Sequence, residues 1–155
     1  MKANIFVVYV IVGAIMGHEH LDKSLSEILV RDIMSKSLIS ADPMTSIYQI
    51  AKLMEKGEVG AILVKKDNSP AGIITDRDFA TKIATQKHPL ETPVHKVASY
   101  PLQTINSNES ILIAAEKMSS KKIRKLAVVE DKQVIGIITS TDLVNQLAKM
   151  KNSSK

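Results

Sequence analysis

The feature that most constrains how this chain can fold is an internal repeat without gaps. Residues 30–84 align with residues 94–148 at a constant offset of 64, and 15 of the 55 aligned pairs are identical. The strongest match sets Gly72–Thr75 against Gly136–Thr139, with Asp78 against Asp142 three residues later. Two copies are too few for a solenoid, so the repeats are expected to pack together as a pseudo-twofold pair.

Both copies predict the same order of elements. An extended stretch is followed by turn-forming residues and by a helix of about three turns, whose apolar residues recur at helical spacing. Two apolar strands joined by a polar hairpin turn come next, and a second helix closes the copy. The predicted strands are 38–40, 61–65 and 71–74, then 102–104, 126–129 and 134–138; the closing helices are 76–86 and 140–150. The order β-α-β-β-α predicts an α/β fold, with helices against a small sheet in each repeat.

The repeats also set the predicted domain boundaries. The expected division is an N-terminal apolar run with a polar leader (1–28), a first repeat (29–87), a linker (88–93), a second repeat (94–150) and a polar tail (151–155).

Residues 3–16 form an almost unbroken apolar run behind Lys2. The run is shorter than the roughly 18–20 residues that span a bilayer, although it resembles the core of a signal peptide. A membrane anchor, a buried β-branched segment, or a start-site artefact with Met16 as the true first residue are the alternatives. A non-secretory origin and a cytoplasmic location are favoured, because the rest of the chain has an intracellular character.

Composition narrows the classes of function. Hydrophobic residues make up 45% of the chain and aromatic residues only 3%, so the core must be aliphatic, and base stacking on single-stranded nucleic acid is disfavoured. The absence of cysteine excludes disulfides, thiolate metal sites and a cysteine nucleophile. The net charge of +5 suits a polyanion, a nucleotide phosphate or simply a solvated lysine-rich surface.

A Thr-x-x-Asp motif follows the last strand of each repeat and admits two interpretations. It is typical of a capping box, in which the threonine and the acid satisfy backbone groups at the start of a helix. The same position favours ligand binding, since a helix N-terminus attracts phosphate and an acid there accepts hydrogen bonds from ribose hydroxyls. Its occurrence at the same point of both repeats favours a binding role.

The repeat, the Ser-Ile-x-x-Ile/Ala-Ala-x-x-Met helix and the Gly-Ile-Ile-Thr-x-x-Asp signature resemble paired CBS domains, the modules named after cystathionine β-synthase. The resemblance covers residues 29–150 and implies two ligand clefts related by the pseudo-twofold axis. It also implies that the signature aspartate holds ribose and that the threonine and helix N-terminus hold phosphate. One departure is that Leu63 and Ala127 stand where many family members have proline.

Carried over residue by residue, the resemblance assigns ligand contacts to both clefts. The first cleft would use Ile73, Thr75, Arg77, Asp78, Gln103, Ile123, Arg124 and Lys125. The second cleft would use Met34, Ile39, Val59, Gly60, Ile137, Thr139 and Asp142. For the apolar members, plain core packing is the competing interpretation. We predict tighter binding of a phosphorylated ligand at Asp78, since Arg77, Arg124 and Lys125 would add positive charge to that cleft.

The chain is therefore predicted to be a regulatory module that binds AMP, ADP or ATP, with no catalysis, no cofactor and no metal. No phosphate loop, zinc-protease motif or nucleophile elbow occurs in the sequence. The resemblance also implies a homodimer, because a single pair of such repeats would leave exposed the helix faces that carry Ile47, Ala51, Ile111 and Ala115. An unknown effector protein would receive the signal. The alternatives are a nucleic-acid or protein-interaction module that uses the basic surface, and a membrane-tethered sensor anchored by residues 3–16.

Overall fold

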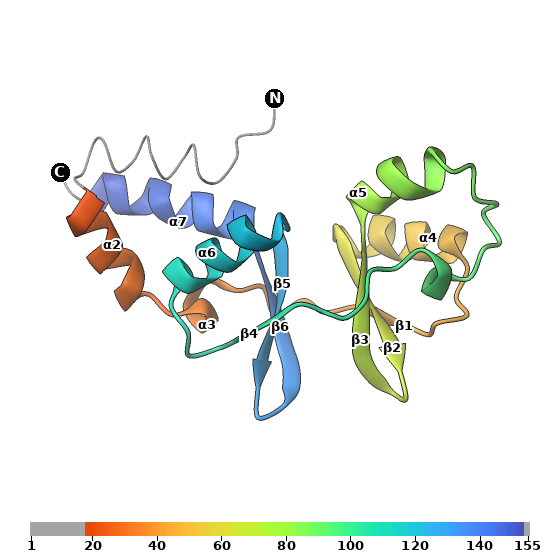
Figure 1. Ribbon diagram of the computed structural model, residues 1–155, viewed down its shortest axis with the longest axis horizontal. Helices are drawn as coiled ribbons and strands as arrows, with labels where there is room; N and C mark the ends of the chain where they lie inside the picture. The colour runs from red at the N-terminus through yellow and green to blue at the C-terminus, as the bar shows by residue number, and fades with distance from the viewer. Residues whose placement is uncertain (1–17, 154–155) are drawn as a thin grey trace. The chain divides into compact units, whose positions relative to one another are not determined.

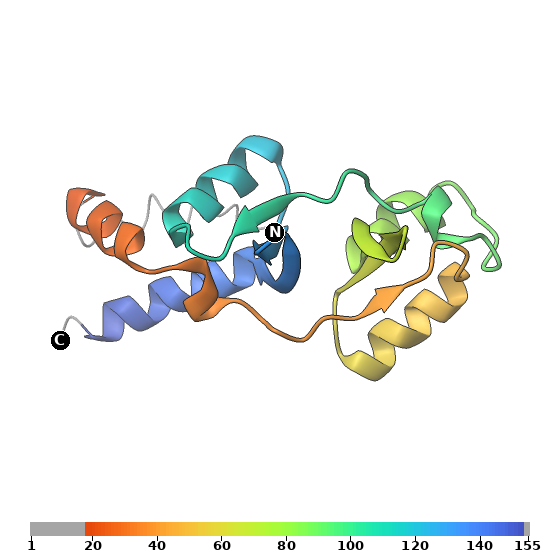
Figure 2. The same ribbon diagram turned by 90° about the horizontal axis from the view of Figure 1, so that it is seen from below.

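A computed structural model describes residues 18–153, and each repeat supplies one three-stranded sheet (Figures 1 and 2). Both sheets have the same topology. The first strand pairs parallel to the second, and the second pairs antiparallel to the third. Helices accompany both sheets, which confirms the predicted α/β class and the repeated order of elements.

The bounds agree closely between the repeats. The first sheet and its helices are β1 (Ser40–Ala41), α4 (Ile47–Gly57), β2 (Ala61–Lys66), β3 (Ser69–Thr75), α5 (Asp76–Asp78), the π-helical η1 (Phe79–Ala84) and the 3-10 turn η2 (Val94–Lys96). The second set is β4 (Thr104–Asn106), α6 (Ile111–Lys121), β5 (Lys125–Glu130), β6 (Gln133–Thr139) and α7 (Ser140–Ser153), preceded along the chain by α2 (His18–Glu27) and α3 (Val30–Ile33).

Local sequence accounts for the ends of α4. The hydroxyl of Ser46 accepts a hydrogen bond from the backbone N–H of Gln49 at 3.2 Å, and the side-chain oxygen of Gln49 accepts one from the N–H of Ser46 at 3.2 Å. This reciprocal pair satisfies two backbone donors that a helix start leaves free. The helix ends at Gly57, because Glu58 takes a left-handed conformation with φ 50°.

Both hairpins turn through two residues with positive φ. Asp67 and Asn68 have φ 51° and 63°, and Asp131 and Lys132 have φ 47° and 64°. Two consecutive left-handed residues match the right-handed twist of the flanking strands, and Asp and Asn adopt this conformation more readily than most residues. The polar links are therefore tight hairpin turns, as predicted.

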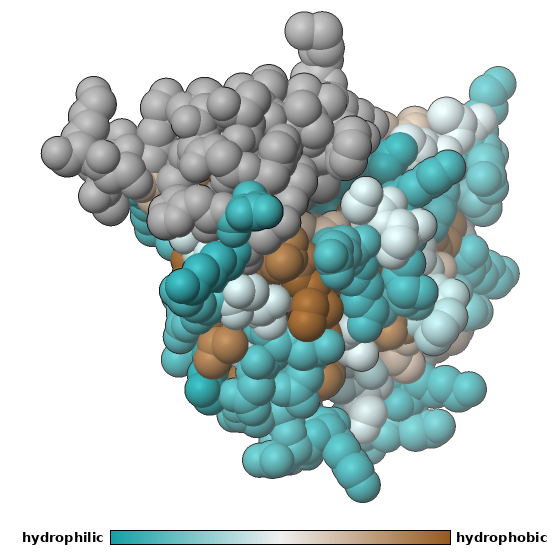
Figure 3. Space-filling view, turned by 60° about the vertical axis from the view of Figure 1, so that its left-hand side comes forward, coloured by the Kyte–Doolittle hydropathy of each residue, from teal (hydrophilic) through white to brown (hydrophobic). Residues whose placement is uncertain are grey.

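Each sheet carries its own aliphatic core. The first residue of α4 and that of α6 are buried in these cores, although the sequence analysis expected them to be exposed. Ile47 and Ile111 are 0% and 1% exposed, so the expectation that they form open apolar faces is wrong. They pack inward because they start the amphipathic face of α4 and α6. Larger apolar residues that are exposed include Met44, Tyr48 and Leu90. On the coloured part of the face that Figure 3 shows, the surface is mainly hydrophilic, with smaller hydrophobic areas between polar ones.

The first residues of each repeat pair with the third strand of the other repeat. Ser35 and Ile137 exchange two backbone hydrogen bonds of 2.9 Å, and Ser99 and Ile73 exchange two of 2.8 and 3.1 Å. As a result the compact units cross the repeat boundaries. Unit 2 is Ser37–Gln103, and the described part of unit 1 is 18–36 with 104–153.

The N-terminal leader contains a helix that the sequence analysis did not anticipate. Within α2, Leu25 is 4% exposed and belongs to the core around β4, β5 and β6. The apolar run 3–16 lies outside the described residues. Of the helices that the structure describes, none is both long and apolar enough to cross a membrane.

Candidate ligand-binding site

The Thr-x-x-Asp motif lies at a strand-to-helix junction in both units. Strand β3 ends at Thr75 and α5 begins at the next residue, while β6 ends at Thr139 and α7 begins at Ser140. Thr75 is extended, with φ −122° and ψ 161°, so the helical conformation starts only after it. Asp78 and Asp142 therefore stand in the first helical turn of their units.

In each unit the threonine fixes one oxygen of the acid. Oδ2 of Asp78 accepts from the backbone N–H of Thr75 at 2.8 Å and from its hydroxyl at 2.9 Å. Oδ2 of Asp142 accepts from the N–H and hydroxyl of Thr139 at 2.7 and 2.8 Å. The backbone N–H of Asp142 also donates to the hydroxyl of Thr139 at 3.2 Å. The capping interpretation is therefore confirmed, and it involves Oδ2 alone, so capping and ligand binding are compatible.

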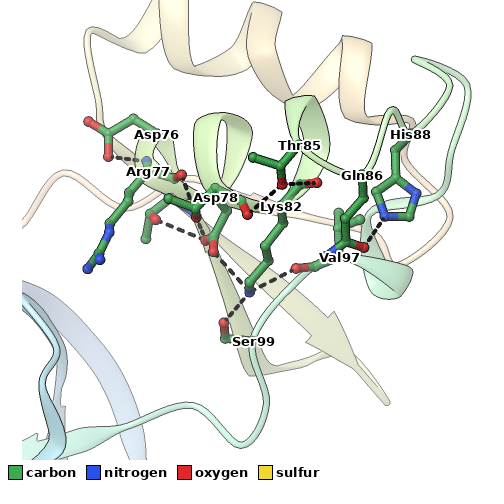
Figure 4. A network of polar contacts seen from close by, with 11 residues as sticks. Asp76, Arg77, Asp78, Lys82, Thr85, Gln86, His88, Val97 and Ser99 are labelled. Carbon is green, nitrogen blue, oxygen red and sulfur yellow. Dashed lines mark hydrogen bonds and ion pairs between the residues drawn. The ribbon is translucent and has the colours of Figure 1, made fainter.

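The second carboxylate oxygen distinguishes the two units. Oδ1 of Asp78 lies 2.9 Å from the ammonium group of Lys82, and Asp78 is buried. Figure 4 shows Lys82 directed between Asp78 and the segment that carries Val97 and Ser99. Its ammonium donates to the carbonyl of Val97 at 3.2 Å and to the hydroxyl of Ser99 at 2.8 Å. Among the residues that the structure describes, no ion pair is formed by Asp142.

The signature glycines let another segment lie directly across the third strand. A Cβ on Gly136 would stand 2.6 Å from Sδ of Met34 and 2.8 Å from the carbonyl oxygen of Ser35. A Cβ on Gly72 would stand 2.4 Å from the ring of Tyr100. Both glycines are therefore required by close approach, and the approaching segments run beside the Thr-x-x-Asp junctions.

The predicted site residues are divided between the two units. Unit 2 contains Ile39, Val59, Gly60, Ile73, Thr75, Arg77, Asp78 and Gln103, and unit 1 contains Met34, Ile123, Arg124, Lys125, Ile137, Thr139 and Asp142. The carbonyl of Gly60 accepts from the N–H of Asp76 at 3.1 Å, and that of Arg124 accepts from Ser140 at 2.9 Å. Each junction thus directly contacts the strand start of its own repeat. The assignment of Arg124 to the Asp78 site stays a prediction.

Lys82 and Ser99 were missed by the sequence analysis. Lys82 follows Asp78 by four residues, a spacing at which opposite charges meet on a helix, and this spacing was a usable signal. Ser99 could not be found in the same way, because its contact with Lys82 depends on the pairing of residues 99 and 73 across the linker.

Two α/β units with duplicated strand-to-helix junctions define a class of small paired-repeat modules. The family model described as CBS domain matches residues 30–85 and 94–149. The chain therefore belongs to the CBS domain family, and a pair of such domains is a regulatory ligand-binding module.

Relatives differ in how much of their length this chain covers. CBS domain-containing protein YhcV of Bacillus subtilis is 35% identical over 120 residues, which are 77% of this chain and 86% of the relative. A homoserine O-acetyltransferase of Methanohalobium evestigatum is 34% identical over 125 residues, but these are only 25% of its length. The similarity to the enzyme is thus confined to a part of it.

Solved structures support the fold. An uncharacterized conserved protein from Pyrococcus horikoshii has a TM-score of 0.74 and 25% identity, over 78% of this chain and 92% of that one. The CBS domain pair of protein MJ0100, solved in complex with 5′-methylthioadenosine and S-adenosyl-L-methionine, has a TM-score of 0.69 and 31% identity. The latter match covers 76% of this chain and 98% of the other.

Proposed function

We propose that the chain is a cytoplasmic regulatory module that binds an adenosyl ligand, with AMP, ADP and ATP as the first candidates, and that it catalyses no reaction itself. The observation that carries the proposal is the duplicated junction, in which each threonine fixes one oxygen of the signature aspartate. The MJ0100 domain pair, which holds two adenosyl compounds, supports the ligand class.

The chemistry of the junction suits a nucleoside. Because Oδ2 of Asp142 is fixed by Thr139, the carboxylate has a defined orientation, and Oδ1 is an acceptor of the kind that binds ribose hydroxyls. The helix that starts here, α7, runs for 14 residues. Its first turn carries backbone donors and positive potential that favour a phosphate group. Met34 and Ile137 lie on the neighbouring backbone pair and are proposed to contact the base.

A panel of ligands tests the proposal by thermal shift. AMP, ADP, ATP, 5′-methylthioadenosine and S-adenosylmethionine are added at equal concentration, and at least one should raise the melting temperature. Binding at 100 times the dissociation constant adds about 2.7 kcal/mol of stability. Asp78→Asn combined with Asp142→Asn should remove the shift, while Asp131→Asn, in the exposed hairpin, should keep it.

The outcomes separate the alternatives. A shift that survives in the double variant would contradict the proposed site. If no adenosyl compound raises the melting temperature but duplex DNA does, and the effect of DNA falls steeply with salt concentration, a nucleic-acid-binding module would be favoured. We also propose that the chain forms a homodimer. Exposed apolar side chains on unit 2 support it, and not the helix residues Ile47 and Ile111, which were expected to be exposed and are buried.

A further inference from the structure

Lys82 occupies the carboxylate oxygen of Asp78 that the threonine leaves available, Oδ1. Its ammonium group has three protons and three acceptors around it, which are Oδ1 of Asp78, the carbonyl of Val97 and the hydroxyl of Ser99. The side chain of Asp78 is 12% exposed and that of Lys82 is 34% exposed, so both charges of the pair are largely withdrawn from water. The contacts bridge the β3–α5 junction and the segment after η2 (Figure 4).

The second repeat has no lysine at the position that corresponds to Lys82. At the offset of 64, Lys82 corresponds to Gln146 on α7, which is neutral. The described partners of the Asp142 carboxylate are the N–H and hydroxyl of Thr139, both on Oδ2. The two junctions therefore have the same cap and differ in what faces the remaining oxygen.

We propose that Lys82 is a built-in competitor that occupies the Asp78 site, so that the chain binds its adenosyl ligand at Asp142. This inference rests on the proposed function and adds that a side chain of the protein itself controls which of the two sites binds the ligand. Ribose hydroxyls are neutral donors, and they would have to replace a charge-assisted hydrogen bond, which is roughly twice as strong. They would also leave a lysine in a partly buried place without its counter-charge, which is unfavourable.

The inference reverses the order of affinity expected from sequence. That expectation considered only cations that could reach a phosphate, namely Arg77, Arg124 and Lys125. It did not include a cation that takes the ribose acceptor itself. Arg77 is exposed, and its backbone N–H is the group that bonds to Asp76, at 2.8 Å.

Exchanging the two residues tests the inference. Calorimetric titration with AMP and with uncharged 5′-methylthioadenosine is carried out on the full chain, on Lys82→Gln and on Gln146→Lys. The intact chain should bind one ligand per chain, and Lys82→Gln should gain a second site or at least tenfold tighter binding at the weaker one. Gln146→Lys should lose at least tenfold in affinity, because a lysine four residues after Asp142 can reach its carboxylate.

Lys87→Gln serves as the matched control, since it removes an exposed cation from the same unit and should leave both probes unaffected. If the intact chain binds but neither exchange alters stoichiometry or affinity, the role of Lys82 is overturned and the proposed function stands. If neither probe binds any of the variants, the proposed function fails and this inference fails with it. Melting curves identify a variant that does not fold, and the opposite exchange then decides the outcome.

Discussion

Single residues explain why the signature has a glycine. Gly72 and Gly136 lie under segments that come from the other sequence repeat, and the distances of 2.4 and 2.6 Å to a Cβ leave no room for a side chain. The sequence marks both positions as identical between the repeats without showing what approaches them. The threonine and aspartate of the same signature were predictable as a cap, because capping depends only on residues three apart.

Replacement of either glycine by alanine should destabilise its unit, through contacts with different neighbouring atoms. Gly136→Ala is expected to destabilise unit 1 by about 1–3 kcal/mol, the usual cost of overpacking, because the nearby carbonyl of Ser35 is held by paired backbone bonds. Gly72→Ala should cost a similar amount, but the nearest atoms there belong to the ring of Tyr100. In a Tyr100→Ala background most of that cost should disappear. Urea unfolding measures the free energy of unfolding of the intact chain, the three single variants and the Gly72→Ala, Tyr100→Ala double variant. A penalty for Gly72→Ala that is unchanged in the Tyr100→Ala background would contradict this account.

At the level of elements, the strands and longer helices of each repeat were predictable, whereas η2 and α2 were not. Periodic apolar residues and turn formers locate α4, α6 and the hairpins. The short stretch η2 and the residue after it contribute Val94 and Val97, which are 0% and 4% exposed in the core of unit 2. Their burial depends on a pairing distant in sequence, which local periodicity does not encode. Helix α2 was missed for the same reason, since its only described buried residue is Leu25.

Two fragments distinguish the structural unit from the sequence repeat. The fragment 37–103 retains Val94, Val97 and the Ser99–Ile73 pairing, so it should fold cooperatively by itself. The fragment 29–87 lacks these residues and exposes the edge of β3, and each buried residue lost from a core typically costs about 2–5 kcal/mol. Circular dichroism during thermal melting measures both. Equal cooperativity in the two fragments would show that the repeat, and not unit 2, is the folding unit.

For the whole molecule, the duplication that was visible in the sequence yields two units that share a sheet topology and differ at the lysine that pairs with the signature aspartate of one unit. The fold class, the aliphatic cores and the acids at the junctions all follow from patterns inside a repeat. The exchange of segments between repeats does not, because it depends on which of two similar sheets a segment pairs with. The ion pair of Asp78 with Lys82 is local, four residues apart, but the exchange supplies Val97 and Ser99, the other two acceptors of the lysine.

Self-association is also a property of the whole chain. Tyr48 and Leu90 are 49% and 56% exposed, and the N–H of Tyr48 donates to the carbonyl of Leu90 at 3.1 Å, so the two residues lie together on unit 2. If they are covered in a homodimer, light scattering at micromolar concentration should give twice the chain mass. Tyr48→Ser with Leu90→Ser should shift the protein to monomer, whereas Lys66→Ser, exposed at the end of β2, should not. A monomeric mass for the unaltered protein would contradict the homodimer.

The most direct test of the account is to locate the ligand by amide chemical shifts. In a titration of the isotope-labelled full chain with AMP, the amides of Thr139 and Asp142, which form the cap at β6 and α7, should shift most and saturate together. The amides of Asp131 and Lys132, in the hairpin turn of the same unit, should stay in place. Shifts that saturate in the hairpin or on scattered lysines, with the Thr139 and Asp142 amides unchanged, would contradict an adenosyl site at the signature aspartate.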